Sequence, residues 1–125
     1  MKYHILLFME IKANTFFSAL SNEIRLRCLM LLQLQGELCV CELTHTLDLS
    51  QPMISRHLAL LRNNGLVSDR RAGQWIYYRI NPDLEEWALG VLVMTAQANF
   101  DKAPFCDDLN VLEDMPNRPG SACCA

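Results

Sequence analysis

The sequence lacks the features of a membrane or secreted protein. The apolar run Ile5–Met9 is far too short to cross a bilayer, and no small-residue cleavage site follows it. No low-complexity tract or internal repeat occurs in the 125 residues, of which 51% are hydrophobic and 20% charged. The sequence therefore predicts a cytoplasmic globular protein with no membrane partner, of a length that suits one domain.

Motifs for catalysis are also missing. No cofactor-binding motif occurs, and no general base is placed near the cysteines in the sequence. We therefore expect a protein that is not an enzyme and requires no cofactor. The enzyme alternative is a thiol oxidoreductase that uses Cys39 and Cys41, and turnover of a disulfide substrate without DNA affinity would favour it.

Negative charge is scarce in the middle of the chain. The whole chain carries −3, but the stretch Ser50–Ile80 contains five arginines and one aspartate. That stretch therefore carries +4 and the rest of the chain −7. A basic block within an acidic chain is typical of a face that binds a polyanion such as DNA, although a solvated charged surface gives the same pattern.

What is present is a series of helices with capping signals. Capping residues and apolar periodicity predict helices at Thr15–Leu20, about Ser21–Gln33, about Cys41–Leu47 and Gln51–Asn63. Ser50 is a good N-cap for the last of these, and Pro52 fits its first turn because no N–H is needed there. Only a tight turn separates the last two helices, which predicts a helix-turn-helix.

The rest of the sequence predicts a hairpin, a helix and a tail. An aromatic and β-branched stretch ending at Ile80, preceded by a turn at Ala72–Gln74, favours two paired strands. Pro82 is expected to start a final helix. We expect a mostly α-helical fold with a β-hairpin wing, that is, a dimeric winged helix-turn-helix in residues 1–100, and a flexible cysteine-containing tail in residues 101–125.

The second helix of the helix-turn-helix and the hairpin carry polar side chains that suit DNA. A major groove admits one helix, and a hairpin can reach the backbone or the minor groove. The candidate DNA-contacting residues are Ser50, Gln51, Met53, Ser55, Arg56, His57, Arg62, Arg70, Arg71 and Gln74. For His57, contact with phosphate and packing within the fold are both open. A protein-binding winged helix is the alternative, and loss of binding with rising salt would favour DNA.

Dimerisation follows from how little DNA one such helix can read. A symmetric dimer places two recognition helices about 34 Å apart, one turn of DNA. The apolar surfaces of the first and last helices are the ones left over for pairing, so we assign the dimer contact to them. The alternative is that the stripe Leu84–Thr95 only caps the core of its own domain, and we expect it to share both roles.

The six cysteines suggest soft-metal or redox chemistry. Two sulfurs that share one ion must lie within about 4 Å of each other, but positions i and i+2 of a regular helix point apart. Either Cys39 therefore lies in the turn before the helix of Cys41, or ion binding distorts the start of that helix. Two buried apolar thiols are the alternative, and Cys28, on an apolar stripe, is predicted to belong to the core.

These segments together resemble the ArsR/SmtB family of metal-responsive repressors, over about Phe16–Gln97. The resemblance rests on four segments in this order: Glu37–Leu43, Leu49–Leu58, Leu61–Val67 and Asp69–Arg79. It is closest to the arsenic-responsive branch. It implies a homodimer that binds operator DNA through Ser50–Arg62 and the wing Arg70–Gln74, and that is released when As(III) or Sb(III) binds Cys39 and Cys41.

One departure from the family concerns the third sulfur ligand. The enteric pattern has a cysteine three residues after the second, where this chain has Thr44. The third ligand could be Cys106, Cys123 or Cys124, an external thiol, or none. A response to Cd(II), Pb(II) or thiol oxidation is the alternative signal, although the extra N-terminal cysteines of the cadmium sensors and the histidines of the zinc sensors are absent from the matching segments.

Overall fold

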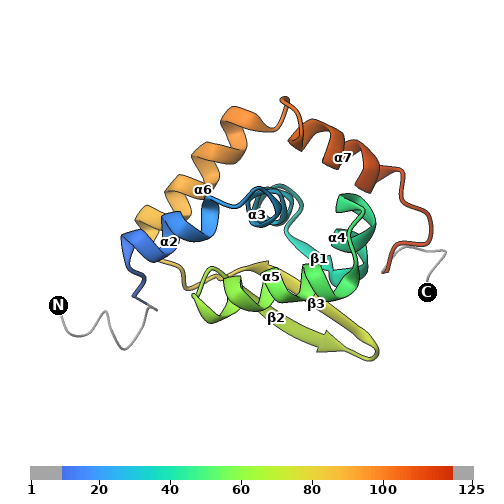
Figure 1. Cartoon of the computed structure of the whole chain (residues 1–125), viewed down its shortest axis with the longest axis horizontal. Helices are drawn as coiled ribbons and strands as arrows, with labels where there is room; N and C mark the ends of the chain where they lie inside the picture. Colours follow the sequence, from blue (N-terminus) through green and yellow to red (C-terminus); the bar gives the residue numbers. More distant parts are fainter. Residues whose placement is uncertain (1–9, 120–125) are drawn as a thin grey trace.

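The apolar stretch Cys28–Leu32 forms the middle of helix α3 (Glu23–Gln35) and is fully buried. In the computed structural model, which describes residues 10–119, α3 lies at the centre and the other elements surround it (Figure 1). This burial confirms the prediction that Cys28 belongs to the core. The elements in chain order are α2 (Ala13–Leu20), α3, β1 (Glu37–Cys39), α4 (Val40–Leu47), α5 (Gln51–Asn63), β2 (Val67–Ala72), β3 (Trp75–Ile80), α6 (Glu86–Asn99) and α7 (Phe105–Glu113).

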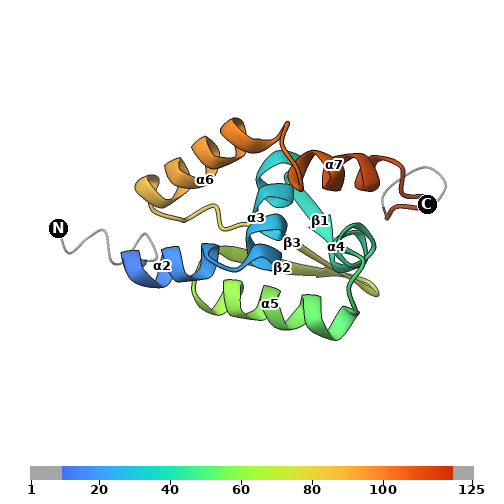
Figure 2. The ribbon, with the colours of Figure 1, turned by 45° about the horizontal axis from the view of Figure 1, so that its top comes forward.

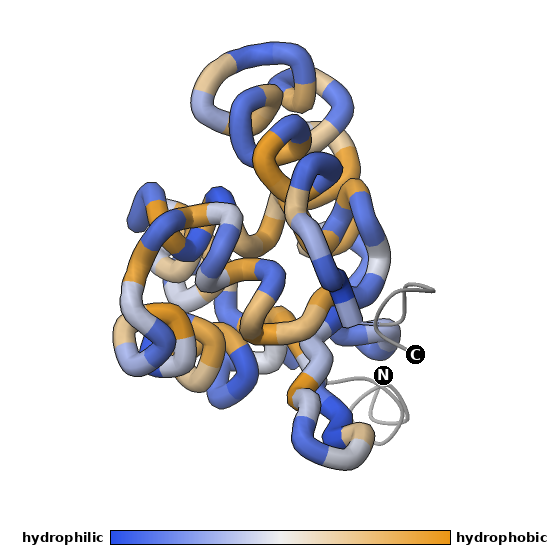
Figure 3. The backbone as a smooth tube through the Cα atoms, turned by 90° about the vertical axis from the view of Figure 1, so that its right-hand side faces the viewer, coloured by the Kyte–Doolittle hydropathy of each residue, from blue (hydrophilic) through white to orange (hydrophobic). Residues whose placement is uncertain are grey.

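The start of α3 lies slightly later than predicted. Asn22, not Ser21, is its N-cap, because the Asn22 side chain accepts a hydrogen bond from the Arg25 amide at 3.0 Å. The Ser21 hydroxyl donates instead to the Ser18 carbonyl and ends α2. Figure 3 shows hydrophobic and hydrophilic residues alternating along the helical turns, the pattern from which these helices were predicted.

The predicted hairpin is confirmed and belongs to a small sheet. Strands β2 and β3 pair antiparallel from Val67 with Ile80 to Ala72 with Trp75, and Gly73 turns the chain with a φ of +61°. A third strand, β1, pairs with the other edge of β3 and makes the order β1-β3-β2. Its three residues are too few to show an alternating pattern, so this strand could not be predicted from the sequence.

Helix α6 starts four residues later than the predicted start at Pro82. The Asn81 side chain donates to the Gly65 carbonyl at 3.0 Å and accepts from the Asp83 amide at 3.0 Å. These bonds hold a turn after β3, because an Asx turn satisfies the backbone without a helix. The helix itself begins at Glu86 and buries Ala88, Leu92 and Ala96 against the core.

The prediction of a flexible tail from residue 101 onward is wrong for Phe105–Glu113, which form α7. Leu112 is 1% exposed, and Asp108 accepts two hydrogen bonds from the Arg27 guanidinium, at 2.9 and 2.6 Å. The helix packs against α3 and α4 (Figure 2). Cys123 and Cys124, also assigned to the tail, lie outside the described residues. No helix within residues 10–119 has the length and hydropathy needed to span a bilayer.

Candidate thiol site and DNA-binding surface

Cys39 and Cys41 lie at the junction between a strand and a helix. Cys39 is the last residue of β1 and the N-cap of α4, with extended backbone angles, and Cys41 lies in the first turn of α4. Their Sγ atoms are 3.0 Å apart. Of the two geometries that the sequence left open, the structure shows the first, in which Cys39 precedes the helix. The two sulfurs are therefore already close enough for one soft ion to contact both.

The Glu42 carboxylate holds the junction between β1 and α4 through two contacts. One carboxylate oxygen accepts the Cys39 amide at 2.7 Å, which completes a capping box, and the other accepts from Arg118 Nε at 2.7 Å. Glu42 is only 3% exposed; its bond to the Cys39 amide is buried, whereas its contact with Arg118 is partly buried. This role of Glu42 was not predicted from the sequence, although the Cys-x-x-Glu spacing is a local signal for it; Arg118 is 76 residues away.

The environment of Cys41 keeps its thiol protonated. Burial raises the pKa of Cys41 to about 12, and the neighbouring Cys39 thiol and Glu42 carboxylate add to the rise. A soft ion must therefore displace the Cys41 thiol proton when it binds. Burial is also the main cause that raises the pKa of Cys28 to about 12, as expected of an inert core thiol.

The described residues supply two sulfurs to this site and no third ligand. Within residues 10–119 no three His, Cys, Asp or Glu side chains gather in a way that could hold a metal ion. Cys106, one of the predicted third ligands, lies on α7, where its Sγ is 3.9 Å from Asp107. Thr44, one turn after Cys41, donates its hydroxyl hydrogen bond to the Val40 carbonyl at 2.8 Å.

A cleft of about 400 Å³ connects the thiols with α5 and the hairpin. Three segments line this cleft: the start of α4 with the two thiols, the first turns of α5, and the tip of the hairpin. Its lining residues are Cys39, Val40, Cys41, Thr44, His45, Gln51, Ser55, Gln74, Trp75 and Ile76. Three of the predicted DNA-contacting residues therefore share a cleft with the predicted ion ligands.

Helix α5 has the form expected of a recognition helix. The Ser50 hydroxyl caps it by accepting the Met53 amide at 3.4 Å, and Ile54, Leu58 and Leu61 are completely buried. The opposite face is polar. Gln51, Arg56 and Arg62 are exposed there, and Met53, Ser55 and His57 are half-buried.

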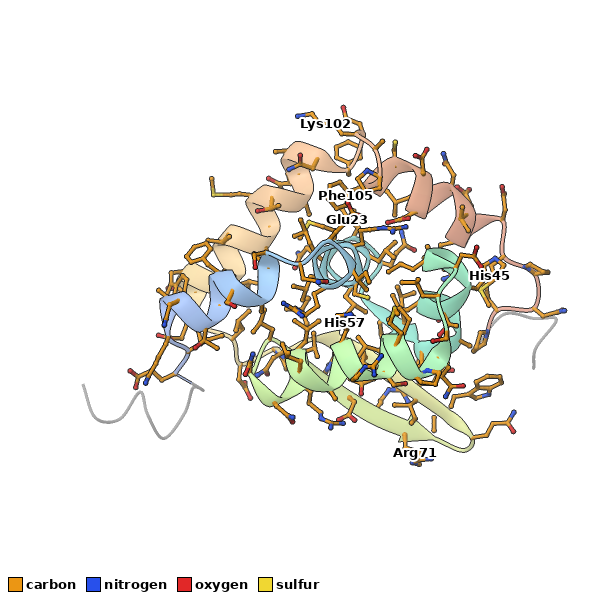
Figure 4. The ribbon with its side chains drawn as sticks, in the orientation of Figure 1. Glu23, His45, His57, Arg71, Lys102 and Phe105 are labelled. Carbon is orange, nitrogen blue, oxygen red and sulfur yellow. The ribbon has the colours of Figure 1, made fainter. Side chains whose placement is uncertain are left out.

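The arginines of the basic block differ in their partners. Arg62 contacts Asp69 at 3.1 Å. Arg70 makes a two-point contact with Glu37, at 2.9 and 2.6 Å, and lies 4.5 Å above the Tyr77 ring. Arg56 and Arg71 are exposed and form no ion pair within the described part of the chain. Figure 4 shows Arg71 pointing away from the hairpin.

His57 lies on the side of α5 that faces α3 (Figure 4). Its Nδ1 accepts a hydrogen bond from Arg25 at 3.4 Å. Burial lowers the pKa of His57, and the positive charges of Arg25 and Arg56 lower it further. Of the two alternatives for this residue, the geometry favours packing within the fold over contact with phosphate.

Comparison with known proteins places these features in one family. Residues 22–69 match the family described as bacterial regulatory protein, arsR family. The chain is 50% identical over 110 residues to the arsenic resistance transcriptional regulator ArsR2 of Pseudomonas putida, covering 86% of this chain and 94% of that protein.

Two further similarities concern activity and assembly. The arsenical resistance operon repressor of Escherichia coli is 51% identical over 76 residues, covering 61% of this chain and 65% of that protein. Among solved structures, the homodimeric winged helix-turn-helix DNA-binding domain of Mycobacterium bovis Mb0332 superposes with a TM-score of 0.58 at 30% identity, covering 68% of this chain and 75% of that one.

Proposed function

This chain belongs to the ArsR family of bacterial regulatory proteins, and from that premise we propose that it is an arsenite- or antimonite-released transcriptional repressor. As a homodimer it binds operator DNA through α5 and the hairpin, and it leaves the DNA when As(III) bonds to Cys39 and Cys41. The single observation that carries the proposal is the 3.0 Å approach of the two thiols at the N-cap of α4.

The DNA contact is supported by the exposed side chains of α5 and the hairpin. Gln51, Arg56, Arg71 and Gln74 are exposed and lie on elements that flank the cleft. Such side chains donate to base edges and phosphates, and the N-terminus of α5 itself favours a phosphate. Arg62 and Arg70 would have to leave their carboxylate partners, or share them, to bind phosphate.

The release step is a substitution at arsenic, without oxidation or reduction. Arsenous acid carries three hydroxyl groups, and each thiol displaces one of them. Two As–S bonds form, two As–O and two S–H bonds break, and two water molecules leave. Because thiolate is a soft ligand, the exchange is favourable for a soft trivalent ion.

Ion binding is coupled to DNA binding through the residues around the thiols. The bridging ion replaces the S–H···S contact between the two cysteines that line the cleft. Gln51 and Ser55 of α5 line the same cleft. Cys39 also ends the strand that holds Arg70 through Glu37. DNA affinity falls by the difference in ion affinity between the free and the DNA-bound conformations.

The dimer contact is proposed to use α2 and α6. Phe17, Trp87 and Met94 are 50%, 40% and 70% exposed, although each is large and apolar. The rings of Phe17 and Trp87 approach each other with centroids 6.2 Å apart, so α2 and α6 form a common surface. We retain residues 1–100 as the DNA-binding and dimerisation unit and add α7 as a cover over α3 and α4.

Operator release is the direct test. A labelled operator duplex is titrated with the purified chain, with and without arsenite, and binding is followed by fluorescence anisotropy. We expect arsenite to release the wild type but not Cys39→Ser, while Cys106→Ser, which alters a cysteine away from the pair, behaves as the wild type. Equal release of the wild type and Cys39→Ser would remove the thiol pair from the mechanism.

The alternative signals are separated in the same assay. Cadmium, lead and hydrogen peroxide are titrated in place of arsenite. Release by cadmium or peroxide at lower concentration than by arsenite would replace the proposed inducer. Affinity that does not fall with rising salt would contradict phosphate contact and favour a protein-binding role.

A further inference from the structure

We propose that this site takes trivalent arsenic that already carries one carbon substituent, with the substituent seated in the cleft between α4, α5 and the hairpin. The inference rests on the proposed function and names the chemical class of ligand: a monosubstituted organoarsenical(III). Three features of the described residues carry it, namely the number of sulfurs, the identity of the residue one turn after Cys41, and the lining of the cleft.

The number of sulfurs matches an arsenic atom with two exchangeable positions. Trivalent arsenic forms three bonds, and Cys39 and Cys41 provide two of them. Within residues 10–119 no third His, Cys, Asp or Glu side chain joins the pair. A carbon substituent fills the third valence, so the arsenic becomes fully coordinated by these two thiols alone.

The residue at the next helical position is a poor ligand for arsenic. Thr44 lies one turn after Cys41, where a side chain on the same face of α4 could reach the ion. Its hydroxyl is a hard donor and is already bonded to the Val40 carbonyl at 2.8 Å. Thr44 therefore lines the cleft without contributing a ligand.

The cleft next to the thiols offers apolar surface for an organic group. Val40, Trp75 and Ile76 line it together with the two cysteines, and its volume is about 400 Å³. That volume falls in the range of small-molecule sites and exceeds what a methyl or phenyl group needs. Trp75 is 37% exposed at the tip of the hairpin, so an arsenic-bound group would cover aromatic surface that is now open.

The reaction balances without a further reactant. An organoarsonous acid carries one As–C bond and two hydroxyl groups. Two As–S bonds form, two As–O and two S–H bonds break, and two water molecules leave, while the As–C bond and the trivalent state are unchanged. Arsenous acid bound to the same two thiols keeps one hydroxyl group that still exchanges with solvent.

The position of the substituent adds to the release of DNA. Gln51 and Ser55 of α5 and Gln74 of the hairpin line the same cleft, and all three are proposed to contact DNA. A group seated among them occupies space next to the DNA-binding surface. We therefore expect an organoarsenical to release the operator at lower concentration than arsenite does.

The first experiment measures ligand binding to the DNA-free chain by calorimetry and operator release by anisotropy. The probes are phenylarsine oxide, which is phenylarsonous acid in water, and arsenite. For the wild type we expect phenylarsine oxide to bind and release at a concentration at least tenfold lower than arsenite. Trp75→Ala should weaken phenylarsine oxide binding several-fold more than arsenite binding, and Trp75→Phe should restore it because an aromatic face is retained.

A second variant tests the coordination argument directly. Thr44→Cys places a third thiol one turn after Cys41. We expect this variant to bind arsenite more tightly, which reduces or reverses the preference for phenylarsine oxide over arsenite. A Cys123→Ser, Cys124→Ser double variant should leave arsenite binding unchanged.

Any of three results overturns the proposal. The wild type could bind phenylarsine oxide no more tightly than arsenite, or Trp75→Ala could weaken the binding of both compounds by the same factor. Weaker arsenite binding in the double variant would place the third sulfur within the chain. If neither compound binds or releases the operator, the proposed function itself fails. Release by arsenite without preference for phenylarsine oxide overturns only the present inference.

Discussion

At the scale of single residues, the thiol site shows how one amino acid can belong to two elements. Cys39 ends a strand and caps a helix, and its amide is held by Glu42 at 2.7 Å. This placement brings its sulfur next to that of Cys41, which two positions within one helix cannot achieve. The chemistry of the pair therefore depends on the break in secondary structure between β1 and α4.

His57 gives a pH dependence of stability. Its pKa is lowered in the folded chain, so the unfolded chain takes up the proton first as the pH falls through about 6.5. Stability is therefore retained above that pH and lost below it. We expect the urea midpoint to fall less between pH 7.5 and 5.5 in His57→Asn than in the wild type. An identical fall in both proteins would show that His57 does not contribute to this dependence.

If Arg70 contacts DNA as proposed, Glu37 competes with phosphate for it. Its carboxylate accepts hydrogen bonds from Nε and Nη2 on one edge of the guanidinium, and this contact lowers the pKa of Glu37. Glu37→Gln should free Arg70 for phosphate, and so raise operator affinity and steepen the log–log salt dependence by about one unit. Stability should change little, because the attraction within an exposed ion pair is weakened by the surrounding water.

The measurement for Glu37→Gln is operator affinity at several salt concentrations. Asp69→Asn is the matched control for Arg62, which is held by a single contact at 3.1 Å. An unchanged salt slope in Glu37→Gln would mean that Arg70 does not reach the phosphate backbone.

Much of the site at this scale could be predicted from the sequence. The two cysteines and the polar face of α5 are local patterns, and the structure brings them to one cleft. The Arg118–Glu42 and Arg70–Glu37 pairs could not be predicted, because their partners are separated by 76 and 33 residues. Periodicity reports which side of an element is buried, not which distant charge faces it.

At the scale of elements, α7 changes the picture of the chain beyond α6. Its inner face carries Leu112 and Asp108, which contact a core already formed by α3 and α4. Leu112→Ala should destabilise the protein by about 2–5 kcal/mol, as expected for a buried leucine. If α7 were only loosely attached, the same substitution would lower the free energy of unfolding far less.

Urea denaturation measures this effect, and the same helix supplies the control. Val111 is 41% exposed next to Leu112. Val111→Ala should therefore change the free energy of unfolding by less than about 0.5 kcal/mol. Equal small effects for both variants would contradict the packing of α7 described above.

Elements with strong local signals were predictable, and those without were not. The capped and periodic α5 and the hairpin around Gly73 were predicted close to their observed limits. Strand β1 has three residues and exists only because β3 offers it an edge, so its origin is tertiary. The tail segment was misjudged because nine helical residues show too few turns for a clear apolar period.

At the scale of the whole molecule, the exposed apolar face on α2 and α6 predicts the assembly. Met94, 70% exposed, lies on that face. Met94→Glu places a charge there, and a charge cannot be buried in an apolar contact without a large cost. We expect the variant to be a monomer at concentrations where the wild type is a dimer, and to bind the operator more weakly because only one recognition helix is engaged at a time.

Sedimentation velocity and anisotropy together test this prediction. Val111→Glu puts the same charge on an exposed apolar position of α7 and should remain dimeric. If Met94→Glu sediments as a dimer and binds the operator as the wild type does, the dimer uses another surface.

The division between core and cleft has a consequence for how this sensor can evolve. Leu38 and Leu43, which flank the two cysteines along the chain, are buried and fill the interior, whereas the thiols and Thr44 line an open cleft. Substitutions on the cleft side can therefore retune which toxicant is detected without repacking the interior. Laboratory selection for a new inducer should accumulate its changes among those lining positions and leave the leucines untouched.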